Sequence, residues 1–340
     1  MVLAGFGLIA VGLVALPSLP ARGIQRVHFT PKFTPGETLR YQIEVTTKSS
    51  AKMTTPIANP EGGSEFSQTI RMLVRLEVVS VQPTTPPAPP APNAPPGAPS
   101  AAGAVRLRAT YEKSHAESQT DAVNPGAPSP DDPYNRLEGH SIEFTLDPNG
   151  RLSDFQGLED IFPTRSEADP TLSWLKGLSL GSGFPAEGVA VGQKWRNEHP
   201  LAGAPLAGLM WRAESTYLRN EPCSAGENAP TLSPAASADT CAIILTRFEI
   251  FRRGGAHSDA TPEDYRRNGL RTSGTWTGSG ESLDSISLAS GFLVSSSGSS
   301  TQSVDYEITS AVSGSAIHQV GHTESDSEIK LLPDSRQNLP

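Results

Sequence analysis

Apolar and polar residues alternate along much of this chain, which is the pattern of strands that bury one face. The clearest run covers residues 69–81, where every second position is apolar: Ile70, Met72, Val74, Leu76 and Val78. The same alternation predicts strands over 39–45, 105–109 and 142–146, and further strands are expected within the β-rich stretches 188–201, 208–220, 241–253, 272–314 and 315–332. We therefore expect a mainly β fold of antiparallel sheet or sheets, arranged as a curved half-barrel or as a sandwich.

Helices are expected to be short, and to number one to three. In "SEADPTLSWLKGLSLGSG", Asp169 is a suitable N-cap before a proline, and Gly177 or Gly181 would end the helix. A second short helix is expected in "ATPEDYRRNGL", where Thr261 and Pro262 provide a similar start.

The predicted strands divide into two β-rich halves, over residues 27–185 and 186–332. The segment "SISLASGFLVSS" in the second half repeats the strand–turn–strand pattern of "IEFTLDPNGRLSDF" in the first. Each half contains a long loop. The proline-rich loop 82–104 is expected to be disordered, because it lacks backbone donors and apolar periodicity. The second loop is 221–241, and a polar tail follows at 333–340. We expect two related halves, in one domain or two.

The stretch "LDPNGRL" brings Asp147 and Gly150 close together and raises the question of a calcium loop. An EF-hand needs oxygen ligands at its first, third and fifth positions, glycine at the sixth and glutamate at the twelfth. Here the fifth position is Arg151 and the twelfth is Leu158. The segment instead fits a tight hairpin turn with Gly150 in the left-handed conformation.

Residues 1–21 are almost entirely apolar up to Pro17 and end in small residues, as in a secretory signal. No Lys or Arg precedes the apolar run, and its length is close to the ~18 residues that span a bilayer. A single N-terminal membrane anchor is therefore the alternative. In either case the chain is expected to be exported, as a periplasmic or secreted protein.

The only two cysteines, Cys223 and Cys241, stand on either side of a loop between two predicted strands. A lone pair in an exported protein is expected to be oxidised. The bridge would close the base of a hairpin and contribute roughly 3 kcal/mol. The alternative is two free thiols, as a redox pair or metal ligands, but the short C-x-x-C spacing and nearby histidines are missing.

Charge and composition argue against several functions. The formal net charge is −9, so a nucleic-acid interface is not expected. The histidine pair His318 and His322 lacks the glutamate of a zinc motif, and on a strand the two would lie about 13 Å apart. Beside Ser282, Asp284 replaces the second glycine of a nucleophile elbow. We therefore expect no enzyme, no cofactor and no metal site.

The four tryptophans are the remaining candidate site: Trp174, Trp195, Trp211 and Trp276. Ligand pockets are lined mainly by apolar and aromatic side chains, so these residues are candidates for a ligand cleft. Protein cores use the same side chains, so core packing is the alternative.

Three motifs resemble those of uncharacterised exported bacterial proteins that share a domain of unknown function. F-x-P-G-E-x-L-x-Y begins at Phe33, F-x-L-D-x-x-G-x-L at Phe144, and V-x-V-G-x-x-W at Val189. The resemblance implies an antiparallel β protein of the bacterial envelope and supplies no catalytic residues. The chain is more loosely similar to the lipoprotein-carrier folds of the envelope, which implies a curved sheet that holds an acyl chain on its concave face.

These observations predict an exported, non-catalytic envelope protein that binds an apolar ligand or a protein partner on a sheet face. A lipid or an envelope protein is the expected partner, nucleic acid is not, and only an uncleaved N-terminal segment would contact the membrane. The alternative is a structural or surface-interaction protein without a small-molecule ligand. The first function requires an apolar concave face that the protein's own helices leave uncovered; the second requires a filled core.

Overall fold

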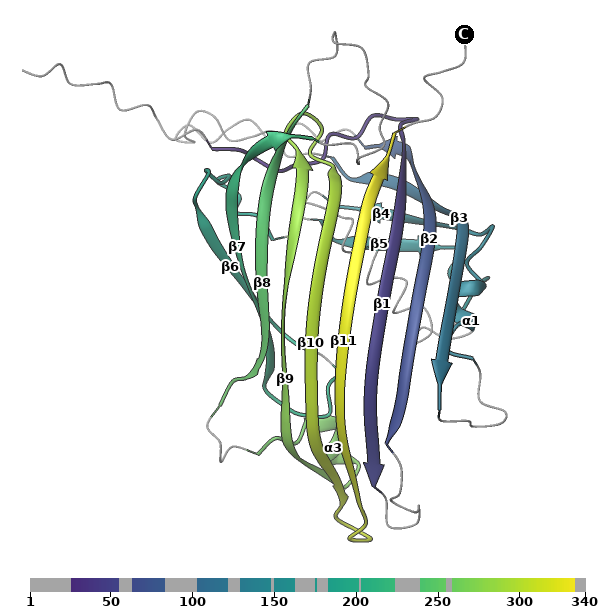
Figure 1. The fold of residues 1–340 in the computed structure, drawn as a ribbon, viewed down its shortest axis with the longest axis vertical. Helices are drawn as coiled ribbons and strands as arrows, with labels where there is room; N and C mark the ends of the chain where they lie inside the picture. Colours follow the sequence, from purple (N-terminus) through teal and green to yellow (C-terminus); the bar gives the residue numbers. More distant parts are fainter. Residues whose placement is uncertain are drawn as a thin grey trace, which may run out of the picture.

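The computed structural model describes residues 26–54, 63–82, 103–121, 129–147, 150–162, 175, 183–201, 203–223, 239–254 and 259–333. Within them, eleven antiparallel strands form one curved sheet (Figure 1). The strands are β1 (Thr38–Thr54), β2 (Ser64–Val81), β3 (Val105–Thr120), β4 (Ser141–Leu146), β5 (Leu152–Gln156), β6 (Lys194–Pro200), β7 (Leu209–Pro222), β8 (Thr240–Arg252), β9 (Leu270–Ser287), β10 (Leu293–Ser310) and β11 (Ala316–Leu332). The predicted mainly β, antiparallel fold is confirmed, and of the two predicted arrangements the single curved sheet corresponds to the half-barrel.

The order of the strands is β5-β4-β3-β2-β1-β11-β10-β9-β8-β7-β6. Every neighbouring pair is consecutive in the chain except β1 and β11, which pair from Arg40–Leu332 to Thr54–His318. The strands of both predicted halves therefore belong to the same sheet. The sheet ends at β5 and β6 and does not close.

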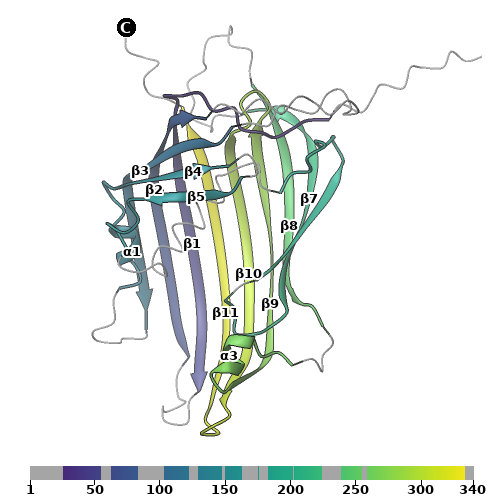
Figure 2. The same ribbon diagram turned by 180° about the vertical axis from the view of Figure 1, so that it is seen from behind.

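One face of the sheet carries the hydrophobic core, and we call it the core face. Along β1, Leu39, Tyr41 and Ile43 point to this face and are buried, while Gln42 points to the opposite, outer face and is exposed. Figure 2 shows β4 and β5 running across the long strands on the core face. The core is contiguous over both sides of the β1–β11 joint, with members such as Val74, Leu107, Phe144, Ile244 and Ile286.

The described residues contain two short helices, α1 (Asp132–Asn135) and α3 (Glu263–Arg267). The helix predicted after Thr261 and Pro262 is confirmed, with Pro262 at the N-cap. Thr261 does not cap it, because its hydroxyl accepts the backbone N–H of Thr272 in β9 at 3.0 Å. Of the helix predicted from Asp169, only Leu175 lies within the described residues, and it is buried in the core.

The β4–β5 connection is the predicted hairpin turn. Gly150 has φ 76°, which glycine tolerates and other residues rarely adopt. The Gly150 N–H donates to the Asp147 carbonyl oxygen at 3.0 Å, and the Arg151 N–H donates to the Asp147 carboxylate at 2.8 Å. Asp147 therefore stabilises the turn itself.

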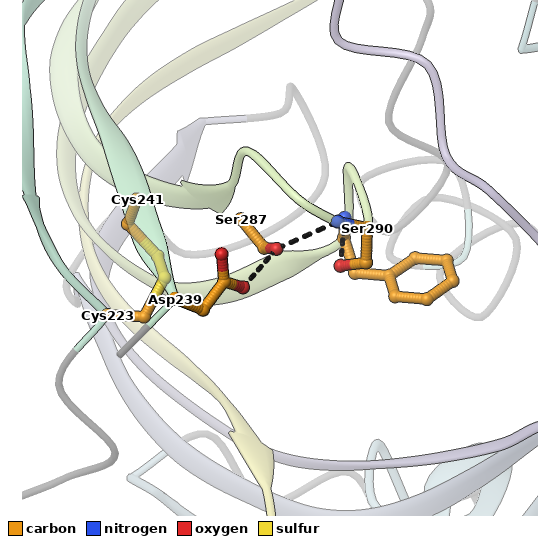
Figure 3. The surroundings of a disulfide bond; sticks show 6 residues. Cys223, Asp239, Cys241, Ser287 and Ser290 are labelled. Carbon is orange, nitrogen blue, oxygen red and sulfur yellow. Dashed lines mark hydrogen bonds between the residues drawn. A yellow bond between two sulfur atoms is a disulfide. The ribbon is translucent and has the colours of Figure 1, made fainter. Parts of the chain in front are cut away.

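The predicted disulfide between Cys223 and Cys241 is present, with the two Cα atoms 4.9 Å apart (Figure 3). It joins the end of β7 to the start of β8. Next to it, the Ser287 hydroxyl donates to the Asp239 carboxylate, and the Ser290 N–H donates to the Ser287 hydroxyl oxygen at 3.0 Å. These contacts connect the disulfide to the β9–β10 turn.

Several sequence predictions concern residues outside the described ranges: the segment 1–21, most of the loop 82–104 and the centre of the loop 221–241. The polar tail is described only at its first residue. The ends of the proline-rich loop are paired, because the Gln82 N–H donates to the Ala104 carbonyl oxygen at 2.8 Å. Over the residues that can be placed, no helix combines the length and the apolar character needed to cross a membrane.

Candidate functional site

The structure places the three described tryptophans on the core face. The pairing register aligns Trp195 with Ser215, Trp211 with Ile250, and Trp276 with Val304. They belong to two clusters. Trp195 packs on the large core beside Phe184, with ring centroids 5.6 Å apart. Trp211 and Trp276 pack on a smaller cluster formed by Leu206, Leu209, Ile250 and Ala260. Trp174 lies outside the described residues.

The apolar part of the core face is covered by the protein itself. Phe29 from the segment before β1, Phe144 from β4 and Phe162 after β5 are each at most 4% exposed in this core. These side chains fill the part of the concave face around the large core, whereas Met53 and Ile317, at the far ends of β1 and β11 on the same face, are 56% and 40% exposed.

The outer face is hollowed across the middle of the strands. Three hollows of about 630, 570 and 560 Å³ lie there. The first and second share Glu324, and the second and third share Ser50, Glu65, Asp121 and His322. Because the hollows share lining residues, we treat them as one continuous surface, which we name the outer groove.

The outer groove runs across the strands. One row of paired residues crosses eight strands from β3 to β7 and lines the hollows throughout: Gln119, Ser67, Lys48, Glu324, Thr301, Ser279, Glu249 and Arg212. At a strand spacing of about 4.8 Å, this row is about 34 Å long. Figure 1 shows the long strands side by side in this order.

Small hydroxyl side chains form the middle of the outer groove, on β9 and β10: Thr275, Thr277, Ser279, Ser299, Thr301 and Ser303. On the core face these strands carry glycines at Gly278, Gly280 and Gly298. Gly280 is required by packing, since a Cβ there would lie 2.5 Å from the ring of Phe248. At residues 278–280 of β9 neither face therefore carries a large side chain, and this part of the strand is held mainly by its backbone hydrogen bonds to β8 and β10.

Ion pairs balance the charge at the β6–β8 end of the outer groove. The Arg212 guanidinium contacts Glu198 at 2.6 Å and Glu249 at 2.7 Å, and Arg247 contacts Glu281 at 3.4 Å. The hydrogen bond from Arg212 lowers the pKa of Glu198 below its usual value. Each of these carboxylates thus has a cationic neighbour.

The other end of the outer groove, from β10 to β3, is acidic. Its lining includes five carboxylates and two lysines: Glu65, Asp121, Asp305, Glu324, Asp326, Lys48 and Lys52. The histidines of β11 join this end: His318 contacts Asp305 at 2.8 Å, and His322 contacts Glu324 at 3.4 Å. The two histidines, four residues apart on one strand, thus contact carboxylates of different strands.

A half-buried carboxyl group, that of Asp284 in β9, lies on the core face. Asp284 accepts hydrogen bonds from the hydroxyls of Ser296 at 2.6 Å and Ser282 at 3.3 Å. Burial raises the pKa of Asp284 above its usual value, and the serine hydrogen bonds only partly oppose this effect. Ionised Asp284 therefore destabilises the fold, and the penalty develops as the pH rises from the usual aspartate range through the raised pKa.

We expect Asp284→Asn to increase the unfolding free energy at pH 7 by on the order of 1 kcal/mol, the cost of a poorly compensated, partly buried polar group. At pH 3 the carboxyl group of Asp284 is largely protonated in both the folded and the unfolded protein. The unfolding free energies of the variant and the wild type should therefore differ little. Urea denaturation at the two pH values measures this, and the wild-type comparison cancels the other titrating groups. An equal increase in unfolding free energy at both pH values would contradict the view that ionised Asp284 destabilises the fold.

Known proteins add little to this picture. No protein-family model matches the sequence, and a search of curated proteins finds no match. Among solved structures, the chain aligns with the outer membrane protein OprG from Pseudomonas aeruginosa at 8% identity and TM-score 0.16, over 89% of this chain and 97% of that chain. It aligns with OccK11 (OpdR) from Pseudomonas aeruginosa at 8% identity and TM-score 0.13, over 91% and 100% of the two chains. Scores this low support no inference about fold or function.

Proposed function

We propose that this chain is an exported, non-catalytic binding protein that holds an extended, hydrophilic partner in the outer groove. The observation that carries the proposal is the row of polar, outward-facing residues that lines continuous hollows across eight strands. β-sheet ladders fix the backbones that carry these side chains, so they are already arranged before a partner arrives.

A polar partner fits the structure better than an apolar ligand. The described apolar side chains of the core face are largely buried against each other, whereas the row of the outer groove consists of hydroxyl, amide and charged groups. Such groups provide the hydrogen-bond donors and acceptors that orient a hydrophilic chain.

Three observations support export. The Cys223–Cys241 disulfide is typical of an oxidising compartment. The apolar segment 1–21 and the resemblance to exported bacterial proteins agree with it. We place the protein in the periplasm or outside the cell, with a single N-terminal anchor as the alternative.

One contact in the outer groove resembles catalytic machinery. The Ser303 hydroxyl lies 3.0 Å from Nδ1 of His322, and Nε2 of His322 lies 3.4 Å from the Glu324 carboxylate. Acyl transfer also needs hydrogen-bond donors for an oxyanion, which are commonly backbone N–H groups. β10 and β11 each pair on both sides, so their ladders engage the backbone N–H groups there. In this proposal we assign the three residues to binding.

Photo-crosslinking in the native host tests the proposal. A photoreactive amino acid at Thr301 or Ser279, both in the row, is expected to give an adduct of the same additional mass. The matched control is Gln42, which is exposed on the outer face of β1 but does not line the hollows. Equal adducts at Gln42, or none at the two row positions, would contradict the proposal; the second result favours the structural alternative.

A further inference from the structure

We infer that the partner in the outer groove is a cationic extended chain, a lysine- or arginine-rich peptide segment whose basic side chains meet the acidic end between β10 and β3. This inference rests on the proposed function and specifies the chemistry of the partner.

The distribution of charge along the outer groove carries the argument. At the β6–β8 end, Arg212 and Arg247 contact the neighbouring carboxylates within 3.4 Å. At the acidic end, the five lining carboxylates exceed the two lysines, and the contacts of Asp305 and Glu324 are to imidazole rings. Negative charge is therefore left over at one end, on a chain whose formal net charge is −9. A cationic partner is attracted there and an anionic one is repelled.

The carboxylates of the acidic end come from several neighbouring strands, with Glu65 on β2, Glu324 on β11 and Asp305 on β10. A chain that lies across the strands therefore meets carboxylates at more than one point along its length. The acidic end spans five strands, from β3 to β10, or about 19 Å, which about six extended residues would cover.

The row of eight residues also disfavours a neutral glycan, because it contains no aromatic side chain on which a sugar ring could stack. The hollows are lined by Phe66 and Phe248 as well, but the pairing register puts both at core-face positions. The hydroxyls of Ser299 and Thr301 next to the acidic end are suitable hydrogen-bond partners for the ammonium groups and backbone of a peptide.

Calorimetric titration of the full-length protein with hexalysine tests the inference, with hexaglutamate and maltohexaose as comparison ligands. Hexalysine is expected to bind in 50 mM NaCl and to lose most of its affinity in 500 mM NaCl, because salt screens exposed charges. The other two ligands are expected not to bind. The double variant Glu324→Gln/Asp326→Asn should bind hexalysine about fivefold more weakly, since exposed charge pairs contribute about 0.2–1 kcal/mol each.

The matched control is Glu44→Gln/Glu328→Gln, which removes the same charge from the outer face outside the hollows, where these residues pair with Arg71 and Lys330. It should bind hexalysine like the wild type, and circular dichroism should show that both double variants are folded. Equal weakening by both variants would show that binding follows net charge, and would overturn the inference.

Binding of hexaglutamate or maltohexaose in place of hexalysine would also overturn it. Crosslinks at Thr301 and Ser279 without hexalysine binding would overturn the cationic partner and leave the proposed function standing. Absence of those crosslinks would instead contradict the proposed function itself.

Discussion

Tyr41→Ala is expected to lower the unfolding free energy by about 3–5 kcal/mol, the cost of removing a large buried aromatic side chain. Tyr41 is 2% exposed and packs in the large core from β1, the strand that joins the two sides of the sheet through β11. Its hydroxyl donates to the Leu293 carbonyl oxygen at the start of β10, at 3.2 Å. Denaturant unfolding, followed by tryptophan fluorescence, measures the loss.

The control for this prediction is Tyr41→Phe, which keeps the ring and removes the hydrogen bond. It should cost only about 1 kcal/mol. Burial raises the pKa of Tyr41 well above its usual value, so the hydroxyl stays a donor throughout the accessible pH range. A small loss in the alanine variant would mean that the ring does not lie in a packed core, and would contradict the described arrangement of β1.

The double variant Cys223→Ser/Cys241→Ser is expected to lose about 3 kcal/mol of unfolding free energy. The disulfide closes a loop with a sequence separation of 18, and removing it frees the unfolded chain. Urea denaturation should show the midpoint at a lower concentration.

Reduction of the wild-type protein is the control, and it should produce the same loss without a change of side chain. The urea unfolding curves of the reduced wild type and of the serine variant should then coincide. If the variant were destabilised and the reduced wild type were not, the loss would come from the serine side chains near buried Cys241, and the disulfide would contribute little.

Local sequence patterns predict much of this fold, because each of them reports a local property. Alternation identifies which residues of a strand share a face, so Tyr41 and Ile43 are placed correctly on the core face. Gly150 predicts its turn because few other residues tolerate a positive φ. Cys223 and Cys241 form the predicted disulfide because the two strands that carry them are neighbours in the chain.

The pairing of β1 with β11 is not predictable in the same way. These strands are more than 250 residues apart, and their register depends on the whole sheet. The same limit applies to the tryptophans: alternation relates positions within one strand, but it does not separate Trp195 from the cluster that contains Trp211 and Trp276.

The outer groove is hidden from sequence reasoning for a related reason. Its residues come from eight strands, and each strand alone shows only ordinary solvent-facing side chains. The sequence does contain one indication of this surface. In β9 and β10, serine, threonine and glycine occur at both the odd and the even positions, so neither face of these stretches is clearly apolar. A strand with that composition gains little from core burial, which makes its exposed hydroxyls candidates for binding.

The most direct measurement of the central claim is a photo-crosslinking scan along the row, one strand at a time, at Ser67, Lys48, Glu324, Thr301, Ser279 and Glu249. A partner that lies across the strands should give adducts of one mass at consecutive positions of this row. Outer-face positions outside the hollows, such as Gln42 and Glu143, should give none. Adducts that follow a single strand along its length, or that gather at Gln42 and Glu143, would contradict the outer groove as the binding site.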